Sequence, residues 1–556
     1  MPKLTRTNFS IKQLTDMYTS GEIAIPEIQR DFVWDAKRIR LLIDSIRKDF
    51  PSGAIILWRP EFKTRSEYEM LIRPERLHLY KKRLPTYLLL DGQQRLTALC
   101  SVILPSDQVI NSLGEEITLP KLFINLKTLD IEARKESTSP SNNEVLLNRI
   151  LSEETDTSGL STVLSEISSR KDIILKHKNS LKEFREIILQ YTYPVQILEN
   201  HDYTTVANIF KRVNSQGKIL VTAELELATI VPHWKGFSKL LRTFIREMRV
   251  DGLNADLSFY MKCLAFIATN WPSIENFSKA VVKGEYTVGE LEKYWKATKN
   301  SIRKLNTLLK SNKIDRAELI TTRNAMVPMV YVIAKDKKKK VDNGLFVKWL
   351  IFSMVGGHYT QQTEGVLRRD SYVLTNSLPN VENGFLKLYR QMIKKDLTST
   401  IFQEVDFEGI SSKNPAMLLI YLSLRHNGAK DFSGKTALSI DQISKYQIHH
   451  IFPFEYMLAD DDAESYRKNN GLSRPAFKEQ VNDVANLTFI SLEANQEIKK
   501  RPPFDYLAKL TPTQNLEAHC VPTDPGLWKP ENFGEFCNER RRLLAKAMNS
   551  YIRHLG

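Results

Sequence analysis

Hydrophobic and polar positions along this chain follow two patterns, short apolar runs typical of strands and the longer periodicity of helices. In the first hundred residues, short apolar runs typical of buried strands, at 54–58 and 87–90, alternate with helical patterns such as 41–46. A further strand pattern lies at 193–198, and from about residue 220 to 430 the periodicity is mainly helical. The pattern therefore predicts an α+β protein with a mixed N-terminal region and a mainly helical middle.

The last part of the chain returns to short strands. Strand-like segments at 446–453 and 486–490 precede a helical pattern at 495–500, which predicts the order strand, strand, helix. Within the N-terminal region, residues 131–170 are rich in polar, turn-forming residues, and we interpret them as a polar insertion rather than core. The predicted domains are 1–230, 231–430 and 431–556.

Composition narrows the class of protein. The 556 residues would fill roughly three or four domains, and 42% hydrophobic with 26% charged residues exclude a disordered or collagen-like chain. No apolar run approaches the ~20 residues of a membrane helix, and the N-terminus has no secretory signal, so no membrane association is expected. The four cysteines form no CxxC pair, which argues against a disulfide framework and favours a reducing, cytoplasmic location.

The net charge of +15 predicts a polyanionic partner, with nucleic acid as the first candidate and a solvated basic surface as the alternative. A basic helix near the C-terminus adds to this expectation. An acidic run at 460–462 is interpreted as a solvated loop rather than a metal site. The basic residues of the C-terminal helix are Arg540, Arg541, Arg542 and Lys546.

Two adjacent histidines, His449 and His450, lie at the end of the first C-terminal strand, and Asn486 and Asn495 lie at the two later junctions. Adjacent strand residues face opposite ways, but at a strand end one imidazole could bind a metal ion while the other faces a substrate. Phosphodiester hydrolysis uses such groups. Neutral imidazole serves as a general base near pH 7, a divalent cation neutralises the developing charge, and an amide can orient the base.

These residues, within the sequence HHIFP at 449–453 and beyond it, resemble the HNH (ββα-metal) nuclease motif. More closely, they resemble the C-terminal nuclease domain of GmrSD-like modification-dependent (type IV) restriction enzymes. The resemblance implies that His450 is the general base, that Asn486 orients it, and that His449 and Asn495 are metal ligands. The two ligand positions are often Asp and His in this motif. A site without a carboxylate should hold Mg²⁺ less firmly, which makes Mn²⁺ or another transition ion plausible.

Three short motifs stand out in the N-terminal region, at 25–34, 90–96 and 210–217. Each of them brings Gln, Arg or Asn beside a turn. Arginine forks match phosphate oxygens in a bidentate manner, and Gly92 and Gly217 allow a ligand to approach the backbone closely. These groups could hold a phosphate, but each motif is weak on its own, and the DGQQR sequence could also be merely a turn followed by a polar helix start.

Together these motifs resemble the DGQQR family of ParB/sulfiredoxin-like domains, the partner module of the nuclease in GmrSD-like enzymes. The resemblance implies that this domain binds and hydrolyses a nucleoside triphosphate, such as GTP or ATP, and thereby gates the nuclease. No Walker A motif is present, so the chain is not a P-loop NTPase. The predicted nucleotide-binding residues are Gln29, Arg30, Asp91, Gly92, Gln93, Gln94, Arg95, Arg212 and Asn214.

The predicted architecture is thus a ParB/sulfiredoxin-like α/β N-terminal domain, a mainly helical middle region and a ββα-metal HNH C-terminal domain. The resemblance implies a prokaryotic endonuclease of phage defence that is regulated by nucleotide and restricts modified DNA. A double-strand break would need two such sites and therefore a homodimer. Two alternatives stay open: a non-catalytic ParB-like nucleic-acid switch with a degenerate HNH domain, and an RNA-cleaving abortive-infection toxin.

Overall fold

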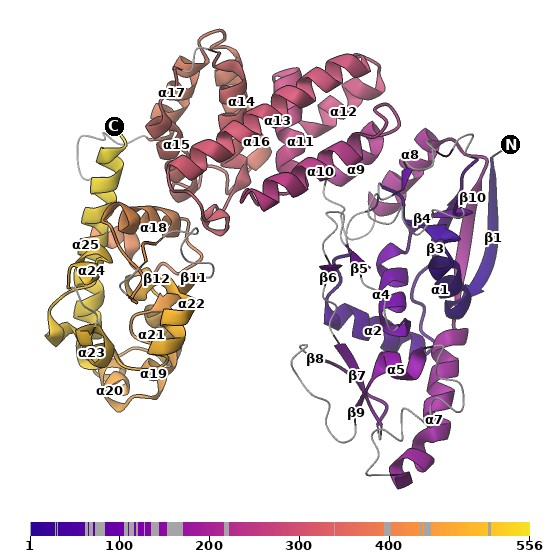
Figure 1. Cartoon of the computed structure of the whole chain (residues 1–556), viewed down its shortest axis with the longest axis horizontal. Helices are drawn as coiled ribbons and strands as arrows, with labels where there is room; N and C mark the ends of the chain where they lie inside the picture. Colours follow the sequence, from indigo (N-terminus) through magenta and orange to yellow (C-terminus); the bar gives the residue numbers. More distant parts are fainter. Residues whose placement is uncertain are drawn as a thin grey trace. The chain divides into compact units, whose positions relative to one another are not determined.

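A computed structural model of the chain defines two compact units, which are described separately (Figure 1). Unit 1 comprises Met1–Glu247 and Ile274–Val288, and unit 2 comprises Met248–Ser273 and Gly289–Gly556. The predicted boundaries after residues 230 and 430 fall inside unit 1 and unit 2, respectively. The structure describes residues 2–27, 29, 32–61, 65, 71–72, 84–104, 109–110, 116–117, 121–126, 128–134, 144–152, 171–215, 222–337, 340–393, 402–433, 436–438, 446–509 and 513–556.

Unit 1 is built around a five-stranded mixed sheet. In the order in which they pair, its strands are β1 (Lys3–Ser10), β10 (Thr192–Glu199), β3 (Ile55–Arg59), β4 (Tyr87–Asp91) and β2 (Ile23–Ala24). β10 is antiparallel to β1 and parallel to β3, β3 is antiparallel to β4, and β4 is parallel to β2. The three strands predicted from apolar runs are confirmed as β3, β4 and β10.

Helices cover both faces of this sheet, which explains why β4 is apolar at consecutive positions. Leu89 belongs to one core, whereas Leu88 and Leu90 belong to the opposite one, because successive side chains of a strand point to opposite faces. The helices of the first core are α1 (Ile11–Thr19), α2 (Ala36–Arg47), α4 (Gln93–Ile103), α5 (Leu147–Leu151) and α7 (Lys171–Gln190). The opposite core is formed with α8 (Tyr203–Ser215) and α9 (Thr222–Ile230).

Part of the predicted polar insertion belongs to a second, three-stranded sheet. Its strands are, in order, β8 (Ile131–Arg134), β7 (Lys121–Asn125) and β9 (Glu144–Leu146). Ile131, Val145 and Ile150 are buried in the first core, so the prediction is wrong for residues 131–134 and 144–152. A few well-spaced apolar side chains among polar neighbours are enough to form core here. The rest of 131–170 lies outside the described residues.

The remaining described elements of unit 1 are two short strands and the helices α10 and α12. β5 (Val109–Ile110) pairs with β6 (Glu116–Ile117) in an antiparallel ladder. α12 (Ile274–Val282) packs against α9 and therefore joins unit 1, although it is distant in sequence. α10 (Phe237–Val250) has a buried Arg242 whose guanidinium donates to the carbonyl oxygens of Glu27 and Gln29.

The first part of unit 2 is helical, as the periodicity predicts. Trp349 is fully buried in this part, and its indole N–H donates to the carbonyl of Ala325 at 2.8 Å. The helices are α11 (Leu257–Thr269), α13 (Val288–Ser311), η2 (Ala317–Leu319), η3 (Arg323–Ala325), α14 (Met326–Lys335), α15 (Asn343–Val355), α16 (Thr363–Thr375), α17 (Val381–Met392), η4 (Glu404–Phe407) and α18 (Ala416–His426).

The C-terminal part of unit 2 holds a small antiparallel ladder of two strands, surrounded by short helices and closed by a long terminal helix. The terminal helix packs against α18, so this part and the helical part form one compact unit. Its elements are β11 (Tyr446–His450), α19 (Phe454–Ala459), α20 (Asp461–Asn469), α21 (Arg474–Val481), η5 (Val484–Asn486), β12 (Leu487–Ser491), α22 (Leu492–Ile498), α23 (Pro503–Tyr506), η6 (Leu507–Lys509), α24 (Thr513–Ala518), η7 (Pro525–Trp528), η8 (Pro530–Asn532) and α25 (Phe533–His554).

The acidic run at 460–462 begins a helix rather than forming a loop, which corrects the prediction. Asp460 is the N-cap of α20, and its carboxylate accepts the backbone N–H of Ala463 at 3.0 Å. Asp461 and Asp462 occupy the first turn, where negative charge interacts favourably with the helix dipole. The predicted α+β class is confirmed. None of the helices in the described residues has both the length and the apolar character needed to cross a bilayer.

Candidate functional site

The C-terminal candidate site has the predicted order of strand, strand and helix. β11 and β12 pair antiparallel, with His449 opposite Thr488 and His450 opposite Leu487. The chain then enters α22 directly, because Ser491 caps this helix by accepting the N–H of Ala494 at 2.9 Å. This tight connection carries the first turns of α22, and with them Asn495, to the side of β11.

The structure brings His449 and Asn495 into direct contact. His449 is 3% exposed, and its Nδ1 lies 2.8 Å from Oδ1 of Asn495. Its Nε2 lies 3.3 Å from the hydroxyl oxygen of Tyr506, whose own proton is donated to the carbonyl of Ile451 at 2.7 Å. The tyrosine oxygen therefore faces His449 as an acceptor, but a neutral imidazole has one N–H, and the shorter contact, 2.8 Å, is the hydrogen bond that Nδ1–H donates to Oδ1 of Asn495.

Burial keeps this imidazole neutral. It lowers the pKa of His449 to about 4, and the contact with Asn495 only partly opposes this effect. In the neutral ring Nδ1–H donates to the amide oxygen of Asn495, and a cation could bind between these two atoms only when the proton moves to Nε2. Rotating the amide by 180° would instead let its NH₂ group donate, and a metal-binding measurement distinguishes the two arrangements.

The residues of this pair fit a divalent cation in ligand type and in spacing. Imidazole nitrogen and amide oxygen are both metal ligands, and neighbouring ligands of an octahedral ion with bonds of about 2.1 Å lie roughly 3 Å apart. The set is nevertheless small. Among the described residues there is no group of three or more His, Cys, Asp or Glu side chains that could hold a metal ion. A cation here would need further ligands from water or from a substrate phosphate.

His450 points to a different partner from its neighbour. Its Nε2 lies 2.9 Å from Oδ1 of Asn482, and the amide NH₂ of Asn482 donates to the carbonyl of Lys478 at 2.8 Å. That second bond turns the amide oxygen toward the imidazole, so Nε2 carries the proton and Nδ1 is left as the basic nitrogen. Burial lowers the pKa of His450, while the bond to Asn482 raises it. This is the arrangement of an oriented general base.

Asn486 does not contact His450, which corrects the predicted direct role. Its amide is fully buried, accepts the N–H of Phe452 at 2.8 Å, and donates to the carbonyls of Phe452 and Val481 at 3.0 and 2.9 Å. These bonds hold the turn that follows His450. Asn482 and Tyr506 are not among the predicted site residues, because in the sequence they are only an amide at the end of a helix and an aromatic residue after two prolines.

The basic residues of the terminal helix are partly structural. Arg540 is fully buried, and its guanidinium donates to the carbonyls of Ala485, His519 and Cys520 at 3.0 to 3.3 Å. Arg541 is 7% exposed and pairs with Asp483 at 3.0 Å. The expectation of a basic DNA-facing run is therefore wrong for these two residues. Arg542 and Lys546 are exposed.

The N-terminal candidate site surrounds the turn between β4 and α4. Gly92 adopts φ +94° there, and a Cβ at this position would meet the side chain of Ile55 at 2.3 Å, so glycine is required. Arg95, one turn into α4, pairs with Asp91 at 3.0 Å and donates to the carbonyl of Ala54 at 2.6 Å. The Asp-Gly turn is thus fixed by an ion pair and by a link to the loop before β3.

Two glutamines complete this turn. The buried Gln29 amide donates to the carbonyls of Leu89 and Leu90 at 2.9 and 2.7 Å, and Oε1 of Gln94 accepts the N–H of Val33 at 2.9 Å. The first and second motifs are therefore joined, as the prediction of a shared site requires. Gln93 lies buried at the start of α4.

The third motif is only partly described. Arg212 is exposed near the end of α8, and Asn214 belongs to the last turn of the same helix. The side chain of Asn214 and all of Arg30 lie outside the described residues. The structure therefore groups Gln29 with the residues of the DGQQR motif. That Arg30, Arg212 and Asn214 also bind the nucleotide stays a prediction.

These features define a class: an α+β protein of two compact units, one with a closed Asp-Gly turn beside a sheet, the other with a buried histidine–amide pair suited to hydrolytic chemistry. Comparison with known proteins narrows this class. Residues 11–231 match the model of the GmrSD restriction endonuclease N-terminal domain. The chain is also 22% identical to the uncharacterized protein MJ0686 of Methanocaldococcus jannaschii, over 99% of this chain and 100% of that relative.

The first match covers most of unit 1 and supports the resemblance for the N-terminal region. It shows that residues 11–231 are similar to the N-terminal domain of restriction endonucleases. The match ends before β11, so the interpretation of the histidine pair rests on its geometry.

Proposed function

We propose that this chain is a nucleotide-regulated, metal-dependent DNA endonuclease of phage defence that restricts modified foreign DNA. The observation that carries the proposal is the pairing of His449 with Asn495 beside an oriented His450. One pair places an imidazole nitrogen and an amide oxygen 2.8 Å apart, and both are possible ligands of a cation. The other imidazole offers a bare nitrogen to water, and together these are the parts that an HNH (ββα-metal) nuclease needs.

In this mechanism Nδ1 of His450 accepts a proton from the water that attacks the phosphorus atom, in line with the leaving 3′ oxygen. Asn482 holds the imidazole by its Nε2–H and stabilises the imidazolium that forms, because an amide oxygen accepts more strongly from a charged donor. Asn486 keeps the following turn in place. A divalent cation, Mg²⁺ or Mn²⁺, held by His449 and Asn495 would supply charge neutralisation at the phosphate and the leaving oxygen.

For unit 1 we propose binding and hydrolysis of a nucleoside triphosphate, such as GTP or ATP, at the Asp-Gly turn. The support is that Gln29, Asp91 and Arg95 converge there, together with the N-terminus of the long helix α4, which favours phosphate. Arg30, Gln93, Gln94, Arg212 and Asn214 are the further candidates. Hydrolysis in unit 1 would regulate cleavage by unit 2, and two chains would act together for a double-strand break.

The deciding experiment is side-by-side digestion of modified phage DNA, unmodified DNA and total RNA, in Mg²⁺ or Mn²⁺, with and without nucleotide. We expect metal-dependent cleavage of modified DNA. Manganese binding measured by electron paramagnetic resonance should weaken in the Asn495→Ala variant. Cleavage of RNA alone would make the protein an RNA-cleaving toxin, and no cleavage of any substrate would contradict the proposal.

A second candidate function is a non-catalytic ParB-like switch that binds DNA through a degenerate nuclease domain. The observation that favours it is that the described residues contain no group of three or more His, Cys, Asp or Glu side chains that could hold a metal ion. In that case DNA binding would persist without cleavage, and manganese binding would not depend on Asn495.

The N-terminal site yields a separate prediction. The Asp91→Asn variant should lower nucleotide turnover about tenfold or more, because it removes the charge that holds Arg95 at the turn. Turnover is measured as phosphate release from GTP and from ATP. The matched control is Asp130→Asn, an exposed aspartate in the turn after β7, which should turn over nucleotide at the parental rate. Equal rates in both variants would exclude this site.

A further inference from the structure

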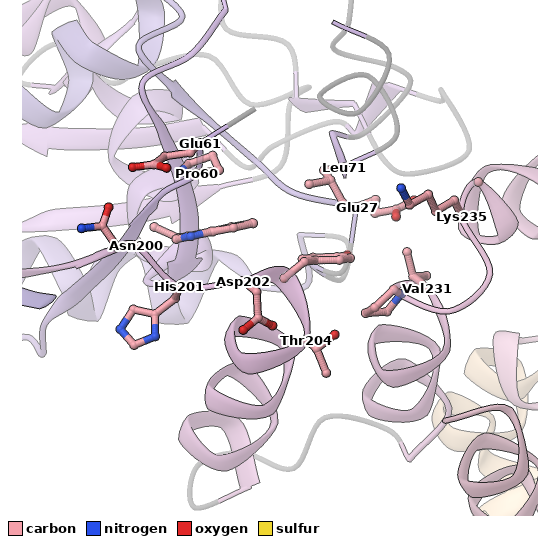
Figure 2. A pocket seen from close by; sticks show the side chains of 14 residues that line it. Glu27, Pro60, Glu61, Leu71, Asn200, His201, Asp202, Thr204, Val231 and Lys235 are labelled. Carbon is pink, nitrogen blue, oxygen red and sulfur yellow. The ribbon is translucent and has the colours of Figure 1, made fainter. Parts of the chain in front are cut away.

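Unit 1 contains a cavity, and none of the predicted nucleotide-binding residues whose side chains the structure describes lines it. Its volume is about 450 Å³, within the range of small-molecule sites. It lies between the end of β3, the loop from β10 into α8, and the turn after α9. Figure 2 shows His201, Asp202 and Thr204 on one side, Val231 and Lys235 on the other, and Glu27 and Leu71 between them.

One wall of the cavity is aromatic. The rings of Trp58 and Tyr203 stack with centroids 5.8 Å apart and planes 11° from parallel. Leu71 and Val231 add aliphatic surface. A flat apolar wall of this kind suits a planar ring, because stacking and dispersion act over its whole face.

Two buried polar atoms in the lining lack a hydrogen-bond partner within the described part of the chain. They are Oε1 of Glu27 and the hydroxyl oxygen of Tyr203. Glu27 is 2% exposed, and its carboxyl group also interacts with Ser238 and Arg242. Buried polar groups are almost always paired, so two such atoms lining one cavity indicate a missing ligand.

The protonation of Glu27 restricts what that ligand can be. Burial raises the pKa of Glu27 to about 8, in spite of Arg242 and the hydrogen bond with Ser238. The group is therefore mainly a neutral carboxylic acid at pH 7 and can donate as well as accept. Together with the hydroxyl of Tyr203 it offers two O–H groups, which match a ring nitrogen or a ring carbonyl.

The charges at the cavity do not suit phosphate groups. Glu61 and Asp202 line it with carboxylates, and the pKa of Asp202 is lowered because its carboxylate accepts the backbone N–H and the hydroxyl of Thr205. Among the described lining residues, Lys235 is the only lysine or arginine, so a single such cation faces the two carboxylates. A neutral ligand is therefore favoured over a triphosphate.

We propose that this cavity binds a nucleobase, a neutral planar heteroaromatic ring whose nitrogen or carbonyl accepts from Glu27 and Tyr203 while its face lies against the aromatic wall. The base could belong to a free nucleoside or to a DNA nucleotide turned out of the duplex. The second source rests on the proposed function, because it requires DNA as the substrate.

The test uses the full chain and two probes. The four deoxynucleosides are titrated by calorimetry, and matched duplexes are compared with duplexes carrying one mismatch, where a base leaves the stack more easily. We expect one nucleoside to bind, and Tyr203→Phe and Glu27→Gln each to weaken it at least tenfold. Tyr193→Phe, which removes the same hydroxyl from the opposite core, is the control and should bind like the parent.

Each outcome is informative. A preference for mismatched duplexes that both variants lose would identify a base from DNA, and nucleoside binding without this preference would identify a free ligand. No nucleoside binding by the parent chain, or equal binding by Tyr203→Phe, would overturn the proposal. DNA cleavage by the parent chain is measured in parallel, so that cleavage without base binding rejects this inference alone, and base binding without cleavage rejects only the nuclease.

Discussion

Replacing His450 by alanine is expected to abolish DNA cleavage, with a loss of roughly 10²–10⁴-fold in the single-turnover rate. The reason is that Nδ1 of this ring is the basic nitrogen left free by the bond between Nε2 and Asn482. Nucleotide hydrolysis should continue at the parental rate, because the Asp-Gly turn belongs to unit 1 and His450 to unit 2. Cleavage at the parental rate by a folded His450→Ala variant would remove the general base from the mechanism.

Asn482, the hydrogen-bond partner of His450, provides a second test of the general base. The Asn482→Ala variant should cleave about 10–100-fold more slowly with unchanged DNA affinity, because the imidazole loses the acceptor that selects its tautomer. Asn482→Asp keeps an acceptor oxygen and should recover part of the rate. If Asn482→Ala cleaved normally while Asn486→Ala lost the activity without loss of stability, Asn486 would be the orienting residue after all.

The sequence predicts much of the scaffold because the period of apolar positions reports directly on the packing of each element. The run at 87–90 is apolar at successive positions because β4 is covered on both faces, and such a run is readable without a structure. The contact between His449 and Asn495 could likewise be predicted, because the strand, strand, helix order brings their elements together.

The errors have a common physical origin in contacts that join distant segments. Asn482 and Asn486 are both amides near β12, and only the three-dimensional path of the chain decides that the first reaches His450 while the second holds the turn. In the region 131–170, average composition hides the few apolar side chains that reach the core. The arginines at 540–542 look like surface charge in the sequence, because the sequence does not show that backbone carbonyls from distant segments surround Arg540.

Arg540 is therefore the site of the second large effect, one of stability. The Arg540→Met variant keeps most of the side-chain volume but leaves the carbonyls of Ala485, His519 and Cys520 buried without their donor. A buried polar group without a partner costs about 1–3 kcal/mol, so the loss for this cluster should be at least about 3 kcal/mol. Thermal unfolding should begin at a lower temperature, and hydrogen exchange should accelerate most at β12, which follows Ala485 in the chain.

The matched control for this prediction is Arg542→Met on the same helix, where the side chain is exposed and pairs with Glu539. Its effect on stability should stay within about 0.5 kcal/mol, whereas its DNA affinity should fall and become less dependent on salt if α25 contacts the phosphate backbone. The Arg540→Met variant should instead lose stability and keep its DNA affinity. Because its guanidinium is fully buried, it cannot reach a phosphate without the helix leaving its place. An Arg540→Met variant that melted like the parent but bound DNA more weakly would show that the guanidinium leaves its carbonyl partners to contact nucleic acid.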